Sequence, residues 1–320
     1  MMTGRCQTGR NPHCRDLRTG RSPVFQPHFR PGSSESVLPA TGSMNGCDSM
    51  SNTAAQCNGS NLGAGYGFAH GTSDGCGVKP VSNVPVVNDP YIGLASKIPP
   101  PSSSGCAGNY PQETKHGNAY SVAASNRLSG TLSLSDGNNF KCGDQMLTAD
   151  LVINAPLGTP AVLIIENGQL DLNGHTLTTS NGSAVTLVFS GDNSGSYIHA
   201  PTDNTNGSGG RLDLAAPTSG PWSGVAIYQD PSLTSGVDVS AAGNSPTWNI
   251  TGLIYMPHAT VTLKGAVDKA TNGKSCVVMV ADNFQISGTA GILQTDIGHC
   301  AEAGLTMPTA VIPARSTLVL

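Results

Sequence analysis

The sequence is short of charged residues and of aromatic residues. Asp, Glu, Lys and Arg make up 11% of the 320 residues, and Phe, Trp and Tyr make up 5%. This charged share is roughly half of that in an average soluble domain. Residues 1–43 hold six Arg against one Asp and one Glu, so the remainder of the chain is net acidic. The scarcity of cations excludes a dense basic face there, and we expect no nucleic-acid binding.

Long apolar runs are also lacking. No run approaches the roughly 18–20 residues that span a membrane, and the first 30 residues contain no apolar core of a signal peptide. Nine cysteines and many Asn, Ser and Thr residues nevertheless indicate an oxidising compartment. We expect a cell-envelope protein, periplasmic or extracellular, whose natural N-terminus with a membrane anchor is missing from this chain. A cytosolic protein with reduced thiols is the alternative.

Short β-type runs punctuated by Gly, Asn or Pro fill the second half of the chain. They lie at residues 132–134, 151–153, 162–165, 170–172, 176–178, 185–189, 212–214, 225–228, 253–255, 261–263, 276–280 and 284–287. Leu170, Asp171 and Leu172 alternate apolar and polar side chains, as a strand with one buried face does. Runs this short and evenly spaced are typical of stacked coils. The sequence therefore predicts an all-β fold, a right-handed parallel β-helix.

Composition divides the chain into four segments. Residues 1–43 are predicted to be a disordered basic tail, since they are rich in Arg, Pro, Gly and Ser without periodicity. Residues 44–127 are expected to be an irregular segment rich in Gly, Ser and Pro, with 81–101 as an extended linker laid over a surface. The solenoid is predicted to span 128–305, and a C-terminal tail to span 306–320.

Two strings within the predicted solenoid carry a family resemblance. The first is APTSGPWSGV at 216–225, followed by YQDP at 228–231, and the second is GLIYMPHATVTLKG at 252–265. Weaker pieces are DPYIGL at 89–94, KCG at 141–143 and VADNFQISG at 280–288. Over roughly residues 85–300 the chain resembles the C-terminal region of TadG-like proteins of the Flp/Tad tight-adherence pilus-assembly class.

The resemblance implies a role outside the cytoplasm in pilus biogenesis or adhesion, with an N-terminal membrane tether. It implies no catalytic residue. The residues of the strings that we expect to be structural are Ala216, Pro217, Thr218, Ser219, Gly220, Pro221, Gly224, Gln229, Asp230, Gly252, Tyr255, Pro257 and Gly265.

Acidic residues are candidates for a hydrolase site, because such enzymes need two or three carboxylates converging on one face. The candidates are Asp171, Asp192, Asp203, Asp213 and Asp230. They stand singly, and we interpret Asp171 and Asp213 as polar partners in alternating strands and Asp230 as a turn cap before Pro231. We expect no catalytic residue, with a carbohydrate-active hydrolase or lyase as the alternative.

No metal or cofactor site is predicted. The histidines considered as ligands are His175, His199, His258 and His299, whose spacings fit neither a helical nor a strand pair. His175 is predicted to be a turn residue at a coil corner. The loops that begin at Asp192 and Asp203 lack the regular acidic ladder that calcium needs. Ser219 has no nucleophile-elbow frame around it.

The cysteines provide two predicted disulfides. Cys276 and Cys300 bracket the last strand signals and would staple the final coil, and Cys106 with Cys142 would tie the linker to the start of the solenoid. Each closure stabilises by about 3 kcal/mol in an oxidising compartment. Pairing among Cys47, Cys57 and Cys76 stays open.

These observations predict a non-enzymatic envelope protein associated with pilus assembly or adhesion. A rigid solenoid would present polar loops, around 192–210 and 231–247, to pilus or envelope proteins or to surface glycans. Besides the carbohydrate-active enzyme, a truncated fragment without independent function is an alternative.

Overall fold

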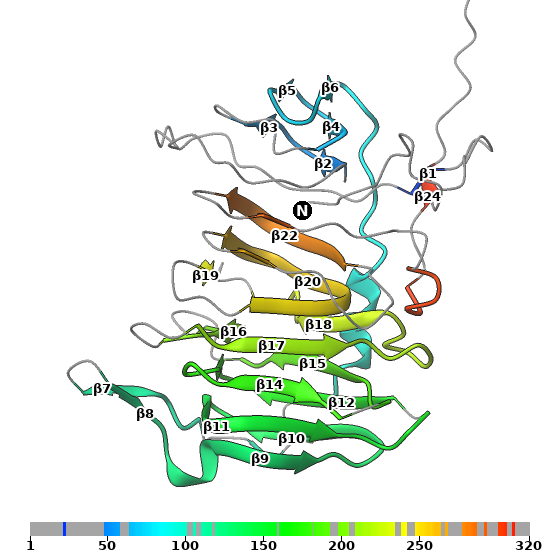
Figure 1. Cartoon of the computed structure of the whole chain (residues 1–320). Coiled ribbons are helices and arrows are strands. Elements are labelled where there is room, and N and C mark those ends of the chain that lie inside the picture. The colour runs from blue at the N-terminus through cyan, green and yellow to red at the C-terminus, as the bar shows by residue number, and fades with distance from the viewer. Residues whose placement is uncertain are drawn as a thin grey trace, which may run out of the picture.

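The computed structural model of the chain is built mainly from β-strands stacked one above another (Figure 1). The residues that it describes are 22–23, 48–57, 64–100, 105–106, 110–116, 119–158, 160–180, 182–192, 198–204, 209–233, 238–241, 247–263, 266–267, 277–286, 291–292, 300–305 and 309–310.

Thirteen of the described strands form one sheet, and the pairings within it are parallel. The strands are β9 (Arg127–Ser133), β10 (Gly137–Cys142), β11 (Gln145–Asn154), β12 (Ala161–Glu166), β13 (Leu170–Asp171), β14 (Thr176–Thr179), β15 (Val185–Ser190), β16 (Pro201–Thr202), β17 (Arg211–Ala215), β18 (Val225–Gln229), β19 (Asp238–Ala241), β20 (Thr247–Leu263) and β22 (Val277–Ile286).

The strands stack in three rows. The row that we call the covered stack contains β10, β12, β15, β18, β20 and β22. Its register aligns Phe140, Ile164, Val188, Tyr228, Tyr255 and Val280. A second stack contains β9, β11, β14, β17 and β20, and a third contains β11, β13 and β16. The chain visits these rows repeatedly, so each strand pairs with one from the neighbouring turn of the chain.

Strand β20 links the rows directly. Its first residues pair with β17 in the second stack, its middle pairs with β18 in the covered stack, and its last residues pair with β19. Gly252 lies where β20 passes from one row to the next, with φ 133°, and a Cβ there would clash with Ala216. The long parallel sheet confirms the all-β prediction and is compatible with the predicted solenoid.

Apolar side chains bury both sides of the covered stack. In β12, Leu163 and Ile165 belong to the large main core, whereas Val162 and Ile164 belong to a separate outer cluster. Successive side chains of a strand point to opposite faces, so a strand buried on both faces is a continuous apolar run. This explains the unbroken runs of β12, β15 and β18, all of whose residues are buried.

Two other segments cover the outer cluster. The 3-10 helix η1 (Ile92–Lys97) and its flanks contribute Tyr91, Leu94 and Ile98, and residues 300–305 contribute Ala303 and Leu305. The predicted linker therefore does lie over a surface, although η1 interrupts its extended backbone. In Figure 1 this segment descends beside the stack from β6 toward β18.

The N-terminal segment is more regular than predicted. Strands β2 (Ser49–Ser51), β4 (Tyr66–Ala69) and β6 (Lys79–Val81) form a parallel sheet, and β3 (Ala55–Gln56) pairs with β5 (Ser73–Asp74). A Cβ on Gly67 would overlap the carbonyl of Cys76, so small residues allow these layers to approach closely. Ala64 belongs to the main core, and Figure 1 shows the small sheet beyond β22.

The remaining described elements are short. They are the hairpin β7 (Thr114–His116) with β8 (Ala119–Ser121), the 3-10 helix η3 (Ala124–Asn126), the parallel pair β21 (Ala266–Val267) and β23 (Gly291–Ile292), and the antiparallel pair β1 (Ser22–Pro23) and β24 (Thr309–Ala310). Within the described ranges, no helix is long and apolar enough to cross a membrane.

Candidate functional site

Residues 110–114, which we call the crossing segment, run across successive turns of the sheet. The Asp144 backbone N–H donates to the Pro111 carbonyl at 2.8 Å, and the Gln112 side chain donates to the Asn167 carbonyl at 3.3 Å. The Tyr110 hydroxyl donates to Asp192 at 3.1 Å. These partners lie on consecutive turns, so the crossing segment ties several layers together.

Glycine at position 143 permits this close crossing. Gly143 has φ 72°, and a Cβ there would overlap the Pro111 carbonyl. A larger residue would face both the strained backbone and this overlap. Gly143 therefore lets the crossing segment lie directly against the turn before β11.

Glu113 is the acidic side chain of the crossing segment, and it is held by two amides. Its Oε2 accepts from Gln169 Nε2 at 2.8 Å and from Asn204 Nδ2 at 2.8 Å. Asp171 of β13 lies beside it with 0% exposure, and its Oδ1 accepts from the backbone N–H groups of Asn173 and Asn204, each at 2.9 Å. Asn204 thus donates to both carboxyl groups.

The other oxygen of each carboxyl has no such donor. Glu113 Oε1 and Asp171 Oδ2 are both buried without an N–H or hydroxyl partner among the described residues. The two carboxyl groups lie in contact, and burial together with this contact raises the pKa of Glu113 to about 8. Burial also raises the pKa of Asp171, against the lowering effect of its hydrogen bonds. A hydrogen bond between two carboxyl groups requires a proton on one of them.

A third carboxylate closes the arrangement. Asp144 accepts from the Glu113 N–H at 2.7 Å and from the Gln169 N–H at 2.9 Å. Burial raises the pKa of Asp144, and these two donors oppose the rise. Asp144 therefore holds the backbone of the crossing segment while Asp171 contacts its side chain.

The enclosure of two carboxyl oxygens limits what this pair can contact. A catalytic carboxyl needs its oxygen within hydrogen-bond reach of the reacting group, but Glu113 Oε1 and Asp171 Oδ2 are enclosed. In the part of the chain that the structure describes, no group of three or more His, Cys, Asp or Glu side chains is arranged to hold a metal ion.

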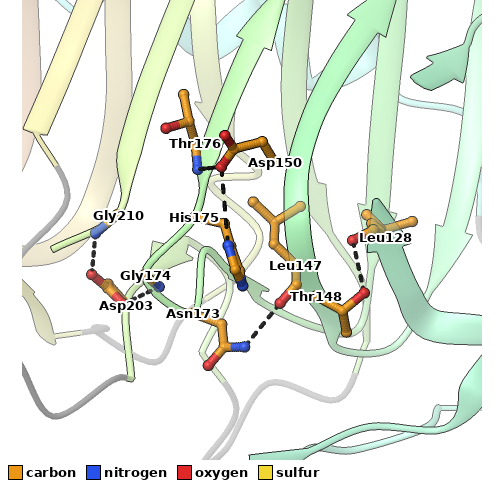
Figure 2. Close-up of polar contacts among 10 residues, drawn as sticks. All are labelled: Leu128, Leu147, Thr148, Asp150, Asn173, Gly174, His175, Thr176, Asp203 and Gly210. Carbon is orange, nitrogen blue, oxygen red and sulfur yellow. Dashed lines mark hydrogen bonds and ion pairs between the residues drawn. The ribbon is translucent and has the colours of Figure 1, made fainter. Parts of the chain in front are cut away.

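A second polar region lies at the turn between β13 and β14 (Figure 2). Asn173, with φ 47°, donates from Nδ2 to the Leu147 carbonyl of the preceding turn at 2.9 Å. Asp203 accepts from the Gly174 N–H at 3.0 Å and from the Gly210 N–H at 2.5 Å. Side chains here join one turn of the sheet to the next.

His175 occupies the same corner, as predicted. Asp150 accepts from the Thr176 N–H at 2.8 Å, and its carboxylate lies 4.0 Å from His175 Nδ1. In this corner, shown in Figure 2, the carboxylate satisfies a backbone donor and borders the imidazole ring.

The five acidic candidates make contacts with different partners. Asp213 pairs with Arg211 at 3.0 Å, and Asp230 accepts from the Ser232 N–H and from Ser190 Oγ. Asp192 accepts from Asn167 Nδ2, and Asp203 occupies the turn described above. Asp171 differs in that it contacts the carboxyl group of Glu113.

The residues of the first resemblance string form a corner that holds residues 300–305. The Gly224 N–H donates to the Pro217 carbonyl at 2.7 Å, and Ser223 Oγ donates to the Gly304 carbonyl at 2.7 Å. A Cβ on Gly224 would overlap Leu305. Ala216 and Pro217 are buried, and Thr218, Ser219, Gly220 and Pro221 form the exposed tip.

Other residues of the strings are interior or lie at turns. Gln229 is buried and donates to the His199 carbonyl at 3.0 Å, Tyr255 is buried in the covered stack, and Pro257 is half-buried in β20. Gly265 and His299 lie outside the described residues.

The structure confirms one predicted disulfide, Cys106–Cys142, and adds Cys57–Cys76 from the set whose pairing was open. Cys300 is buried and disulfide-bonded. Cys276 and Cys47 lie outside the described residues, so the Cys276–Cys300 pair stays a prediction.

Sequence reasoning missed Glu113 and Asp144. Glu113 follows a Pro-containing stretch without periodicity, and no local pattern connects it to β13. The available signal was the Leu170-Asp171-Leu172 alternation, but Asp171 and Leu170 are both fully buried. Two-sided burial at β13 shows that another segment covers it, which the alternation alone does not reveal.

Comparisons with models of protein families, with curated proteins and with solved structures find no match.

Proposed function

We propose that the chain is a right-handed parallel β-helix that serves as a non-enzymatic scaffold of the cell envelope, in the manner of TadG-like proteins. Its task would be pilus assembly or adhesion. Its partners would be pilus or envelope proteins or surface glycans, engaged through the loops around 192–210 and 231–247.

The observation that carries this proposal is that two other segments cover the outer face of the covered stack and that a disulfide anchors the chain beside it. Its outer cluster is closed by η1 and by residues 300–305, and Cys106–Cys142 fixes the intervening chain to the edge strand β10. A row of strands that is buried on both faces, with a disulfide between the covering chain and its edge strand, resists bending. Rigidity of this kind suits a part that transmits force or presents loops at a fixed distance.

The disulfides support the compartment in the proposal. Disulfides persist in oxidising environments and are rare in the cytosol. Two complete pairs are formed among the described cysteines, which favours the periplasm or the cell exterior.

A carbohydrate-active enzyme is the competing function, and the Glu113–Asp171 pair is the observation that favours it. A carboxyl with a raised pKa beside a second carboxyl resembles a general acid and its partner. Enclosure of Glu113 Oε1 and Asp171 Oδ2 argues against substrate access. Polysaccharide turnover by the wild-type chain and its loss in Glu113→Gln would establish the enzyme instead of the scaffold.

The scaffold is tested by recovering the protein from fractionated cells and mapping its disulfides by mass spectrometry. We expect Cys57–Cys76 and Cys106–Cys142 in an envelope fraction, together with copurifying pilus or envelope proteins. Free thiols in a cytosolic fraction would contradict the proposal. A crystal structure of the full chain tests the proposed right-handed β-helix, because a left-handed or unclosed sheet would contradict that fold.

A further inference from the structure

In both Glu113 and Asp171, one carboxyl oxygen accepts hydrogen bonds and the other accepts none from an N–H or hydroxyl group. Glu113 Oε2 and Asp171 Oδ1 each accept two N–H groups. Glu113 Oε1 and Asp171 Oδ2 are enclosed and accept none. Leaving two buried anionic oxygens in neighbouring carboxyl groups is costly, because no donor compensates the charge.

We propose that Glu113 and Asp171 share one proton between these two oxygens, and that this proton is a latch that holds the crossing segment against β13 and releases it under alkaline conditions. The latch goes beyond the scaffold function and does not depend on it. It belongs to the fold itself, because it joins residues 110–114 to the third stack.

Acidic neighbours make the shared proton necessary. The charged groups that raise the pKa values of the pair are Asp144, just before β11, and Asp203, just after β16. Lys115, two residues from Glu113, lies over the Tyr120 ring at 5.0 Å. Loss of the proton would place a second negative charge among these carboxylates, and repulsion would push the crossing segment outward.

The direction of the pH effect follows from linkage. The pKa of Glu113 is raised from 4.5 to about 8 in the folded chain. The folded state therefore binds this proton more tightly than the unfolded state does. The stabilisation is complete below the unfolded pKa, declines as the pH rises above it, and is lost as the pH passes through about 8.

A bound cation fits the site less well than a proton. Gln169, through Nε2, and Asn204, through its backbone N–H and Nδ2, direct hydrogens toward the two carboxyl groups. A cation bound by the two carboxyl groups would need further oxygen ligands at the positions that these N–H groups occupy. A shared proton needs only one oxygen from each carboxyl group.

The test compares thermal unfolding of the full chain with that of Glu113→Gln from about pH 6 to about pH 9. The glutamine amide imitates a protonated carboxyl, since it donates to Asp171 and still accepts on its oxygen. We expect the Tm of wild type to fall by about 4–8 °C more than that of the variant. Asp136→Asn, which removes an exposed carboxylate, is the matched control and should follow wild type.

Local release is measured by trypsin cleavage after Lys115 under non-reducing conditions. We expect cleavage several-fold faster in wild type than in Glu113→Gln at about pH 9, and equal rates at about pH 7. A carboxylic-acid band in the infrared spectrum of wild type at neutral pH, absent from the variant, would identify the proton directly.

Two results would overturn the latch. The first is an unchanged pH dependence of Tm in Glu113→Gln. The second is a recovery of the wild-type Tm at alkaline pH on adding millimolar CaCl2, without the same recovery in the variant, which would assign a cation site. Neither result bears on the envelope fractionation that tests the scaffold.

Discussion

Two stretches before the main sheet attach to it by different physical means. Residues 89–98 lie on the covered stack through apolar and tyrosine contacts. Tyr255 donates to Asp89 at 2.7 Å, and Tyr228 donates to the Tyr91 carbonyl at 3.1 Å. The crossing segment, 110–114, instead lies on a polar corner and depends on carboxyl groups and amides.

The two attachments should respond differently to a rise in pH. Burial raises the pKa values of Tyr91, Tyr228 and Tyr255 above their ordinary range, so these hydroxyls keep their protons under mildly alkaline conditions. Burial raises the pKa of Glu113 to about 8, so this carboxyl loses its proton under mildly alkaline conditions. Desolvation therefore makes the first attachment insensitive to pH and the second sensitive to it.

The largest effect should come from removing the centre of the first attachment. Tyr228 is fully buried, stacks on Tyr255 at 4.7 Å and meets Trp222 edge-on at 5.1 Å. We expect Tyr228→Ala to lower the free energy of unfolding by about 3–5 kcal/mol. Urea unfolding at about pH 6 and about pH 9 should give the same loss, because no titrating group is removed in that range.

Tyr120→Ala is the control for this substitution. Tyr120 is half-buried and contacts Lys115, so its truncation should cost about 1 kcal/mol or less. Equal losses for the two tyrosines would show that the outer cluster does not stabilise the fold.

The disulfide between the two attachments should rank next. Cys106→Ser with Cys142→Ser opens a link between residues 36 apart in sequence. We expect a loss of about 3–4 kcal/mol from loop-closure entropy, measured by urea unfolding without reductant. Reductant also opens Cys57–Cys76, so it should destabilise wild type at least as much as the double substitution does. A double variant as stable as oxidised wild type would contradict the prediction.

A smaller effect should follow from deleting one hydroxyl of the first attachment. Tyr255→Phe keeps the ring in place and removes the donor to Asp89. We expect a loss of about 1.5–3 kcal/mol, as for a hydrogen bond to a charged group. A calorimetric Tm equal to that of wild type would mean that water replaces the hydroxyl.

The smallest effect should come from the exposed pair on the second stack. Arg211 is about half exposed and contacts Asp213 at 3.0 Å. Arg211→Ala should change the free energy of unfolding by about 0.5 kcal/mol or less. A larger loss in urea unfolding would show that another segment packs on this face and contacts the Arg211–Asp213 pair.

Much of the parallel sheet could be predicted from the sequence. The runs at 162–165, 185–189 and 225–228 correspond to β12, β15 and β18, because apolar periodicity and turn residues act over a few neighbouring positions. The pairing of Cys106 with Cys142 was also predicted, since both flank the start of the strand signals.

The N-terminal sheets were not predicted. The described residues between 48 and 81 contain five short strands, but their interior cluster is built from Ala55, Ala69 and the Cys57–Cys76 disulfide, with Met50 as the large apolar side chain buried beside them. With so few large apolar residues the segment shows no apolar period, and close backbone approach at Gly67 contributes to the packing.

By itself the sequence determined the short parallel strands and the corner at His175, because these depend on local alternation and turn residues. Only the tertiary structure decided which segment lies over which strand. Glu113 meets Asp171, and Asp89 meets Tyr255, through contacts between residues far apart in the chain. Such contacts depend on how the layers stack, and no short window of sequence contains that information.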